Sequence, residues 1–234
     1  MPRPSASTES STIAQVLEHH ITQDAKTSTV IVVCCKQSYL LTQLIHVANS
    51  QQTSNSTRAP NPLDEDMLLD NDNDDDNIPI STVSQSHNSI LHSLPTLHLL
   101  AIAEHTQLVF CPNIPTLRAY LAALPSTLPS PTTQLLVLNL LALHDGTSEF
   151  SVQGLSRSFA LLASCAAKLG SDSTVRVLEC TDARDLENPY AGPRLWRNEV
   201  PLLCGSIKIG EAGQGWAHRT VGVRKVAERW FKFD

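Results

Sequence analysis

The apolar residues of the chain fall into two kinds of pattern that alternate along its length. Residues 29–35 form a continuous apolar run, typical of a strand buried on both faces of a parallel sheet, and three other apolar segments also predict strands; they are residues 107–111, 133–144 and 174–180. Four others carry apolar residues at helical spacing; they are residues 39–48, 90–105, 114–124 and 151–169. This order predicts an α/β domain with a mainly parallel sheet flanked by helices.

The first 28 residues predict less structure than the rest. Residues 1–11 are polar, whereas Thr12 and Gln15 form a capping box that opens a short amphipathic helix. We expect a disordered start and a docking helix over residues 1–28, and a single domain over residues 29–234.

Residues 51–88 interrupt the alternation with a polar segment rich in Ser, Asn, Thr and Asp. Such a composition cannot bury enough apolar surface to offset the entropy of ordering, so we predict a disordered acidic insertion. Eight acidic residues lie between Asp64 and Asp76, whereas elsewhere 15 acidic residues face 17 basic ones. The alternating aspartates have the pattern of calcium ligands, but Asp75 stands where an EF-hand needs glycine. We therefore interpret the segment as a solvated acidic run.

Helical spacing is lost beyond residue 180. Residues 181–198 predict a long polar loop, and residues 200–209, 219–226 and 229–233 predict short strands separated by glycine-rich turns. We expect these strands to form a C-terminal antiparallel meander that closes the parallel core.

Glycine is absent from the first 145 residues, and all nine glycines lie at or beyond Gly146. A phosphate-binding loop needs glycine, because its backbone N–H groups must approach the anion without a Cβ in the way. A G-x-x-x-x-G-K-[ST] loop after an N-terminal strand is therefore excluded. The domain either never bound a nucleotide or descends from one that did, and we expect no cofactor.

The remaining chemistry-bearing residues suggest no catalytic centre. The six cysteines lie mostly in apolar patterns without paired spacing, which favours reduced thiols in an intracellular protein. No run of about 18 apolar residues and no apolar leader is present, so we expect neither membrane spanning nor secretion. His144 and Asp145 adjoin near Ser151 and Ser156, but no nucleophile elbow surrounds them. We expect a protein that is not an enzyme and holds no metal ion.

The order of elements in the second half of the chain resembles a known family. The segment TQLLVLNLLALHDGTSEFSVQGLSRSFALLASCAAKLG, followed by TVRVLEC, a loop and a closing meander, is similar to the RecA/Rad51-type ATPase core. The resemblance implies a RecA-like core over residues 29–234. It also implies two DNA-contacting loops, the first at Gly146 to Glu149 and the second at Thr181 to Asn198.

Two departures from the family pattern concern its ATP site. The strand-end aspartate that helps hold magnesium is matched by Asn139, whose amide brings no charge to a hard cation. The phosphate loop would correspond to Cys34 to Ser38, where Lys36 and Ser38 alone do not make a cradle. The resemblance therefore implies a pseudo-ATPase.

Members of this superfamily without an ATP site include small recombinase paralogues, such as those of the Shu complex, and the RecA-like subunits of Elongator. Similarity to the first group implies a non-catalytic, nuclear subunit that forms a heterodimer with another RecA-like paralogue. Such a subunit would bind DNA and assist assembly of the recombinase filament in homologous recombination. The alternatives are a structural subunit of an Elongator-type tRNA-modification complex and an enzyme whose active site carries no recognised motif.

Basic residues gather in the C-terminal third, where eight stand against four acidic ones from Arg194 onward. Such a patch, with aromatic residues among it, could hold a phosphate backbone and stack bases, although strands also direct Arg and Lys to solvent for solubility alone. The candidate DNA-binding residues are Arg184, Arg194, Trp196, Arg197, Arg224 and Lys225. The arginines of the second loop are favoured over Arg224 and Lys225, which could simply flank a sheet edge.

Overall fold

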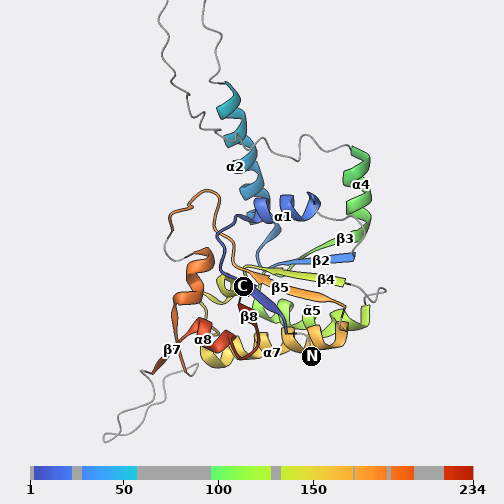
Figure 1. Ribbon diagram of the computed structural model, residues 1–234. Helices are drawn as coiled ribbons and strands as arrows, with labels where there is room; N and C mark the ends of the chain where they lie inside the picture. The colour runs from blue at the N-terminus through green and yellow to red at the C-terminus, as the bar shows by residue number, and fades with distance from the viewer. Residues whose placement is uncertain are drawn as a thin grey trace, which may run out of the picture.

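The computed structural model describes residues 3–22, 28–56, 96–127, 133–170, 172–188, 191–202 and 219–233. Its centre is a sheet of six parallel strands in the order β3-β2-β4-β5-β1-β8 (Figure 1). The strands are β1 (Ser5–Ser7), β2 (Ser28–Val33), β3 (Thr106–Phe110), β4 (Thr133–Leu138), β5 (Thr174–Leu178) and β8 (Lys232–Phe233). The predicted α/β class with a mainly parallel sheet is confirmed.

Helices cover both faces of this sheet (Figure 1). On one side lie α1 (Ile13–Thr22), α2 (Gln37–Ser56) and α4 (Thr96–His105). On the other side lie α5 (Ile114–Thr127) and α7 (Val152–Leu169). The predicted helices are all present, and the capping box of α1 forms in both directions, since Thr12 N–H donates to Gln15 Oε1 at 2.8 Å and Gln15 N–H to Thr12 Oγ1 at 3.3 Å.

The continuous apolar runs arise because each central strand contributes to two cores. Val30 and Val32 of β2 pack into the core beside α5 and α7, whereas Ile31 and Val33 pack into the core beside α1 and α2. Successive side chains of a strand point to opposite faces, so a strand covered on both faces is apolar at every position.

The N-terminal segment, for which the sequence predicted a disordered start, contributes β1 to the sheet, where it lies between β5 and the edge strand β8. Ser5 to Ser7 pairs in parallel with β5 on one side, and Ser5 and Ala6 pair with β8 on the other. Ala6 is fully buried. A strand of three residues with small side chains is too short to show a hydrophobic period. Backbone hydrogen bonds to the two neighbouring strands hold it in place.

The most hydrophobic predicted strand is shorter than expected. β4 ends at Leu138, Asn139 adopts the left-handed conformation (φ 61°, ψ 40°), and the chain turns into the short helix α6 (Leu140–His144). Leu140 and Leu141 are fully buried as helix residues, so apolar composition alone could not distinguish the end of the strand.

The C-terminal region differs from a simple meander. The antiparallel unit is present as the pair β6 (Glu199–Pro201) and β7 (Thr220–Gly222), but residues 223–227 form the helix α8 and β8 joins the main sheet in parallel. The predicted polar loop contains the 3-10 helix η1 (Gly192–Arg197). The apolar side chains of α8 and η1 enter the core beside α7, where Phe231 meets Phe159 edge to face at 5.0 Å.

The acidic insertion falls almost wholly outside the described residues. α2 continues to Ser56, so the first residues of the predicted insertion are helical, whereas residues 57–95 are not described. In the part of the chain that the structure describes, no helix has the length and apolar character needed to cross a membrane.

Candidate functional site

Two cavities open at the carboxyl ends of the strands, where adjacent strands send their chains to opposite faces of the sheet. The chain leaving β2 enters α2 on one face, and the chain leaving β4 leads to α7 on the other (Figure 1). The chain leaving β1 likewise enters α1, whereas that leaving β5 leads to η1 on the α7 side. Open α/β sheets bind ligands at such topological switch points.

The cavity beside β1 and β5, which we name the arginine cavity, has a volume of about 290 Å³. Its polar lining comes from three guanidinium groups and three hydroxyl groups: Arg194, Arg197, Arg224, Thr8, Ser10 and Thr181. None of the described residues that line it is acidic. The arrangement can therefore accept an anion through charge-assisted hydrogen bonds.

Local structure brings these arginines together. Residues three apart eclipse one another in a 3-10 helix, so Arg194 and Arg197 share one face of η1. Arg224 comes from α8, where its guanidinium stacks over Phe233 at 4.9 Å and pairs with the exposed Glu228 at 3.4 Å. Arg194 also donates to the Glu187 carbonyl at 2.9 Å.

Four of the six candidate DNA-binding residues thus line one cavity, but Trp196 serves a different purpose there. Its side chain is 1 % exposed and meets Phe233 edge to face at 5.1 Å, so its ring faces are not available to stack on a base. Lys225 is exposed on α8 and does not line the cavity. The tryptophan instead anchors η1 in the core.

Arg184 lies apart from the other arginines and is already paired. Its guanidinium donates two hydrogen bonds to Asp182, at 3.1 Å and 2.8 Å, and lies 5.4 Å from the ring centre of Tyr39. Tyr39 Oη and Gln43 Nε2 of α2 donate to the same carboxylate. The pairing with Arg184 holds the pKa of Asp182 well below its usual range, while burial raises the pKa of Tyr39 to about 12. This network ties the loop after β5 to α2.

The first loop that the resemblance implied, Gly146 to Glu149, is tied to α5 by an ion pair. Glu149 Oε2 accepts from the Arg118 guanidinium at 2.8 Å, and this pairing lowers the pKa of Glu149. The carboxylate is therefore occupied by a cation of the protein itself.

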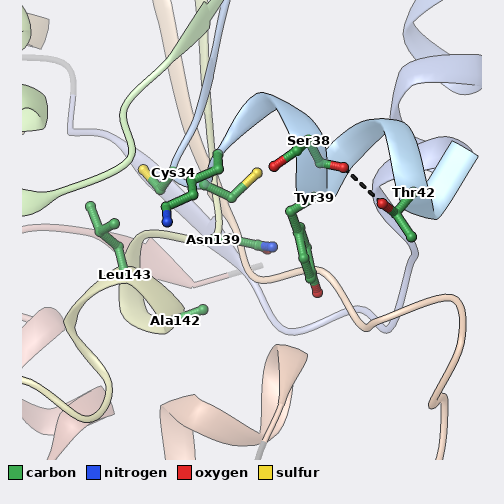
Figure 2. A pocket seen from close by; sticks show the side chains of 9 residues that line it. Cys34, Ser38, Tyr39, Thr42, Asn139, Ala142 and Leu143 are labelled. Carbon is green, nitrogen blue, oxygen red and sulfur yellow. Dashed lines mark hydrogen bonds between the residues drawn. The ribbon is translucent and has the colours of Figure 1, made fainter.

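The second cavity, beside β2 and β4, has a volume of about 570 Å³ (Figure 2). Its lining includes Cys35 and Lys36 from the loop after β2, Ser38 and Tyr39 from the first turn of α2, and Asn139 after β4. We name it the Asn139 cavity, and it shares no lining residue with the arginine cavity.

A buried carboxyl accepts from the backbone of α6, the helix that supplies Ala142 and Leu143 to this cavity. Glu179 follows β5 and is 2 % exposed, and it accepts hydrogen bonds from the N–H groups of Leu141 at 2.6 Å and Ala142 at 3.3 Å. Burial outweighs these donors and raises the pKa of Glu179 to about 8. Burial also raises the pKa of Cys34 and of Cys180, which keeps both as thiols rather than nucleophilic thiolates.

The structure pairs His144 with a serine other than those considered from the sequence. His144 Nε2 lies 3.0 Å from Ser158 Oγ and Nδ1 lies 2.9 Å from the Leu140 carbonyl, while Ser151 caps α7 by accepting from Gly154 N–H. His144 and Ser158 are both fully buried, and burial lowers the pKa of His144. The pair therefore joins α6 to α7 and has no opening through which a substrate could reach it.

Metal ligation finds no support in the described part of the chain, where no group of three or more His, Cys, Asp or Glu residues is placed to hold an ion. The aspartates from Asp64 to Asp76 lie outside the described residues.

Comparisons of the chain with family models, curated proteins and solved structures find no match. The geometry of the two cavities therefore carries the functional argument.

Proposed function

We propose that the protein is a non-catalytic, RecA-like accessory subunit that binds the phosphate backbone of DNA through the arginine cavity. The convergence of Arg194, Arg197 and Arg224 on one concave site carries this proposal. Guanidinium groups are planar, always charged and matched to phosphate oxygens, and the hydroxyl groups of Thr8 and Ser10 add further donors. The recognition is of the backbone rather than the bases, because the aromatic ring at the site is buried.

In this proposal the subunit acts within a complex. It pairs with a second RecA-like subunit and assists assembly of a recombinase filament during homologous recombination in the nucleus. The α/β core with its parallel sheet and its basic loop region supports this assignment. Purification of the protein from its native cells, with identification of the proteins that accompany it, tests the partner; a tRNA-modifying complex instead of a recombinase would overturn it.

DNA binding by the full chain, alone and with its co-purified partner, tests the site. The informative variant changes Arg194, Arg197 and Arg224 to Ala, and binding to labelled duplex is measured over a series of salt concentrations. Each lost phosphate contact should reduce the salt slope by roughly 0.9, so the triple variant should lose about two to three units of slope as well as affinity.

A matched control keeps the change in net charge but spares the cavity. It replaces three exposed basic residues outside the lining: Arg157, Lys168 and Arg229. The control should retain most of the affinity and slope of the unmodified protein. Equal loss in the two triple variants would show that binding follows net charge alone and would refute the assignment of the cavity.

A further inference from the structure

The Asn139 cavity lies at the other topological switch point, between β2 and β4, and the proposed DNA contact makes no use of it. Its walls come from the loop after β2, the start of α2, and Asn139 with the helix α6 that follows it (Figure 2). At about 570 Å³ it has the volume of a small-molecule site.

Asn139 presents an oriented donor to this cavity. Its side chain is 6 % exposed, and its Oδ1 accepts a hydrogen bond from the Cys180 backbone N–H at 2.7 Å. That bond fixes which end of the amide is oxygen, so the nitrogen Nδ2 is the end directed toward Ser38 and Tyr39 across the cavity (Figure 2). No acceptor among the described residues pairs with Nδ2, and the atom keeps some solvent exposure, so it is free to donate to a ligand in the cavity.

The backbone at Asn139 favours the same interpretation. It is the one non-glycine residue with a positive φ in the described part of the chain. Backbone conformations of this kind persist where the surroundings require them, and they cluster at ligand sites. Here the left-handed turn ends β4 and places the Asn139 amide at the carboxyl edge of the sheet.

The remaining walls add positive charge on one side and apolar surface on the other. Lys36 is exposed at the rim and takes part in no ion pair within the described ranges, and Ser38 contributes a hydroxyl group. The Tyr39 ring, Ala142 and Leu143 form the apolar part. No carboxylate of the described residues lines the cavity, so it offers donors without a competing acceptor charge.

We propose that the Asn139 cavity binds a small organic anion. The carboxylate or phosphate of the ligand accepts hydrogen bonds from Asn139 Nδ2 and Lys36 Nζ, and its apolar body packs on Leu143 and Tyr39. Because side chains supply these donors, the site does not depend on the glycine-rich backbone that a nucleoside triphosphate needs. The loop after β2 can therefore bind an anion although it contains no glycine.

Cys35 provides a direct readout, because it lines the cavity and is partly exposed. The rate at which iodoacetamide alkylates Cys35 in the full chain is followed by peptide mass spectrometry. The probes are benzoate and phenyl phosphate, with benzyl alcohol as the neutral analogue. At about ten times its dissociation constant, a bound anion should slow the alkylation roughly tenfold. Benzyl alcohol should leave the rate unchanged.

Two variants assign the effect to the proposed donors. Asn139→Asp keeps an oxygen that accepts from the Cys180 N–H but replaces the donor with a negative charge, so protection should be lost. Lys36→Met keeps the aliphatic stem and should weaken protection even if the first variant folds poorly. Lys168→Met, at an exposed lysine of α7, is the matched control and should behave as the unmodified protein.

The outcomes separate clearly. Protection by benzoate alone identifies a carboxylate ligand, and protection by phenyl phosphate alone identifies a phosphate ligand. Equal protection by benzyl alcohol, no protection by either anion, or protection that survives in both Asn139→Asp and Lys36→Met would overturn the proposal. DNA binding by the arginine cavity is measured separately, so the two proposals stand or fall independently.

Discussion

Titration of Glu179 should make the folded protein less stable as the pH rises from weakly acidic to alkaline. Burial raises the pKa of this carboxyl from 4.5 to about 8, despite its hydrogen bonds from Leu141 and Ala142. Since the pKa is higher in the folded state than in the unfolded state, folding favours the protonated acid. Its contribution to stability is fully present below about pH 4.5 and is lost as the pH rises through about 8.

The expected effect is large relative to the stability of a typical domain. A pKa difference of this size, at about 1.4 kcal/mol per pKa unit, corresponds to roughly 5 kcal/mol above pH 8. Domains are stable by only about 5–15 kcal/mol, so this single carboxyl should dominate the alkaline side of the stability profile. Burial also raises the pKa of the Cys34 and Cys180 thiols, so their ionisation in the unfolded state lowers stability in the same direction at the alkaline end, and this effect is common to all the variants compared.

Urea denaturation from about pH 5 to about pH 9 measures the effect in the unmodified protein and in Glu179→Gln. The variant should lose most of the decline and be the more stable protein at the alkaline end, since the amide keeps an acceptor for the Leu141 N–H without an ionisable proton. Glu9→Gln, which neutralises an exposed carboxyl, should keep the original slope. Titration of His144 occurs in all three proteins and cancels in their comparison. Identical slopes in the unmodified protein and Glu179→Gln would refute the reasoning.

Two further substitutions test the loops that support the cavities. In Gly154→Ala the new Cβ would lie 2.2 Å from the backbone oxygen of Glu149, so we expect the free energy of unfolding to fall by about 1–3 kcal/mol, as measured by thermal unfolding. In the control Gly222→Ala the new Cβ meets open space, so the free energy of unfolding should fall far less. Similar melting temperatures for these two variants would contradict the expected clash. Asp182→Asn should lower the melting temperature at neutral pH, because Arg184 loses its charged partner. Asp182 has a lowered pKa in the folded state, so this difference should shrink in strong acid as the wild-type carboxyl is protonated, and a pH-independent difference would argue against the ion pair.

The parts of the fold that the sequence predicts well are those with a long apolar pattern. β2 and β4 contribute to two cores, so their continuous runs could be recognised from composition alone. β1 could not be recognised, because it is three residues long and its position depends on two distant partners. The end of β4 was also hidden, because Leu140 and Leu141 continue the apolar run as a buried helix.

For the candidate sites too, the sequence indicates residue types but not the contacts that depend on distant parts of the chain. Basic composition pointed to Arg194, Arg197 and Arg224, but only the 3-10 geometry of η1 and the position of α8 bring them to one cavity. Arg184 looked equivalent in sequence, yet the carboxylate two residues before it holds the guanidinium. The sequence shows Asn139 only as an uncharged residue at a strand end, whereas its importance as an oriented donor depends on the backbone N–H of Cys180.

The position of β1 has a consequence for how the chain can reach its folded state. Ser5 pairs with Lys232, so the sheet joins segments that are separated by almost the whole sequence. During synthesis β1 must remain without this neighbour until all the residues between Ser7 and Lys232 have been made. We therefore infer that β8 docks late and that fragments lacking β8 leave β1 with an unpaired edge, a surface open to association with other chains.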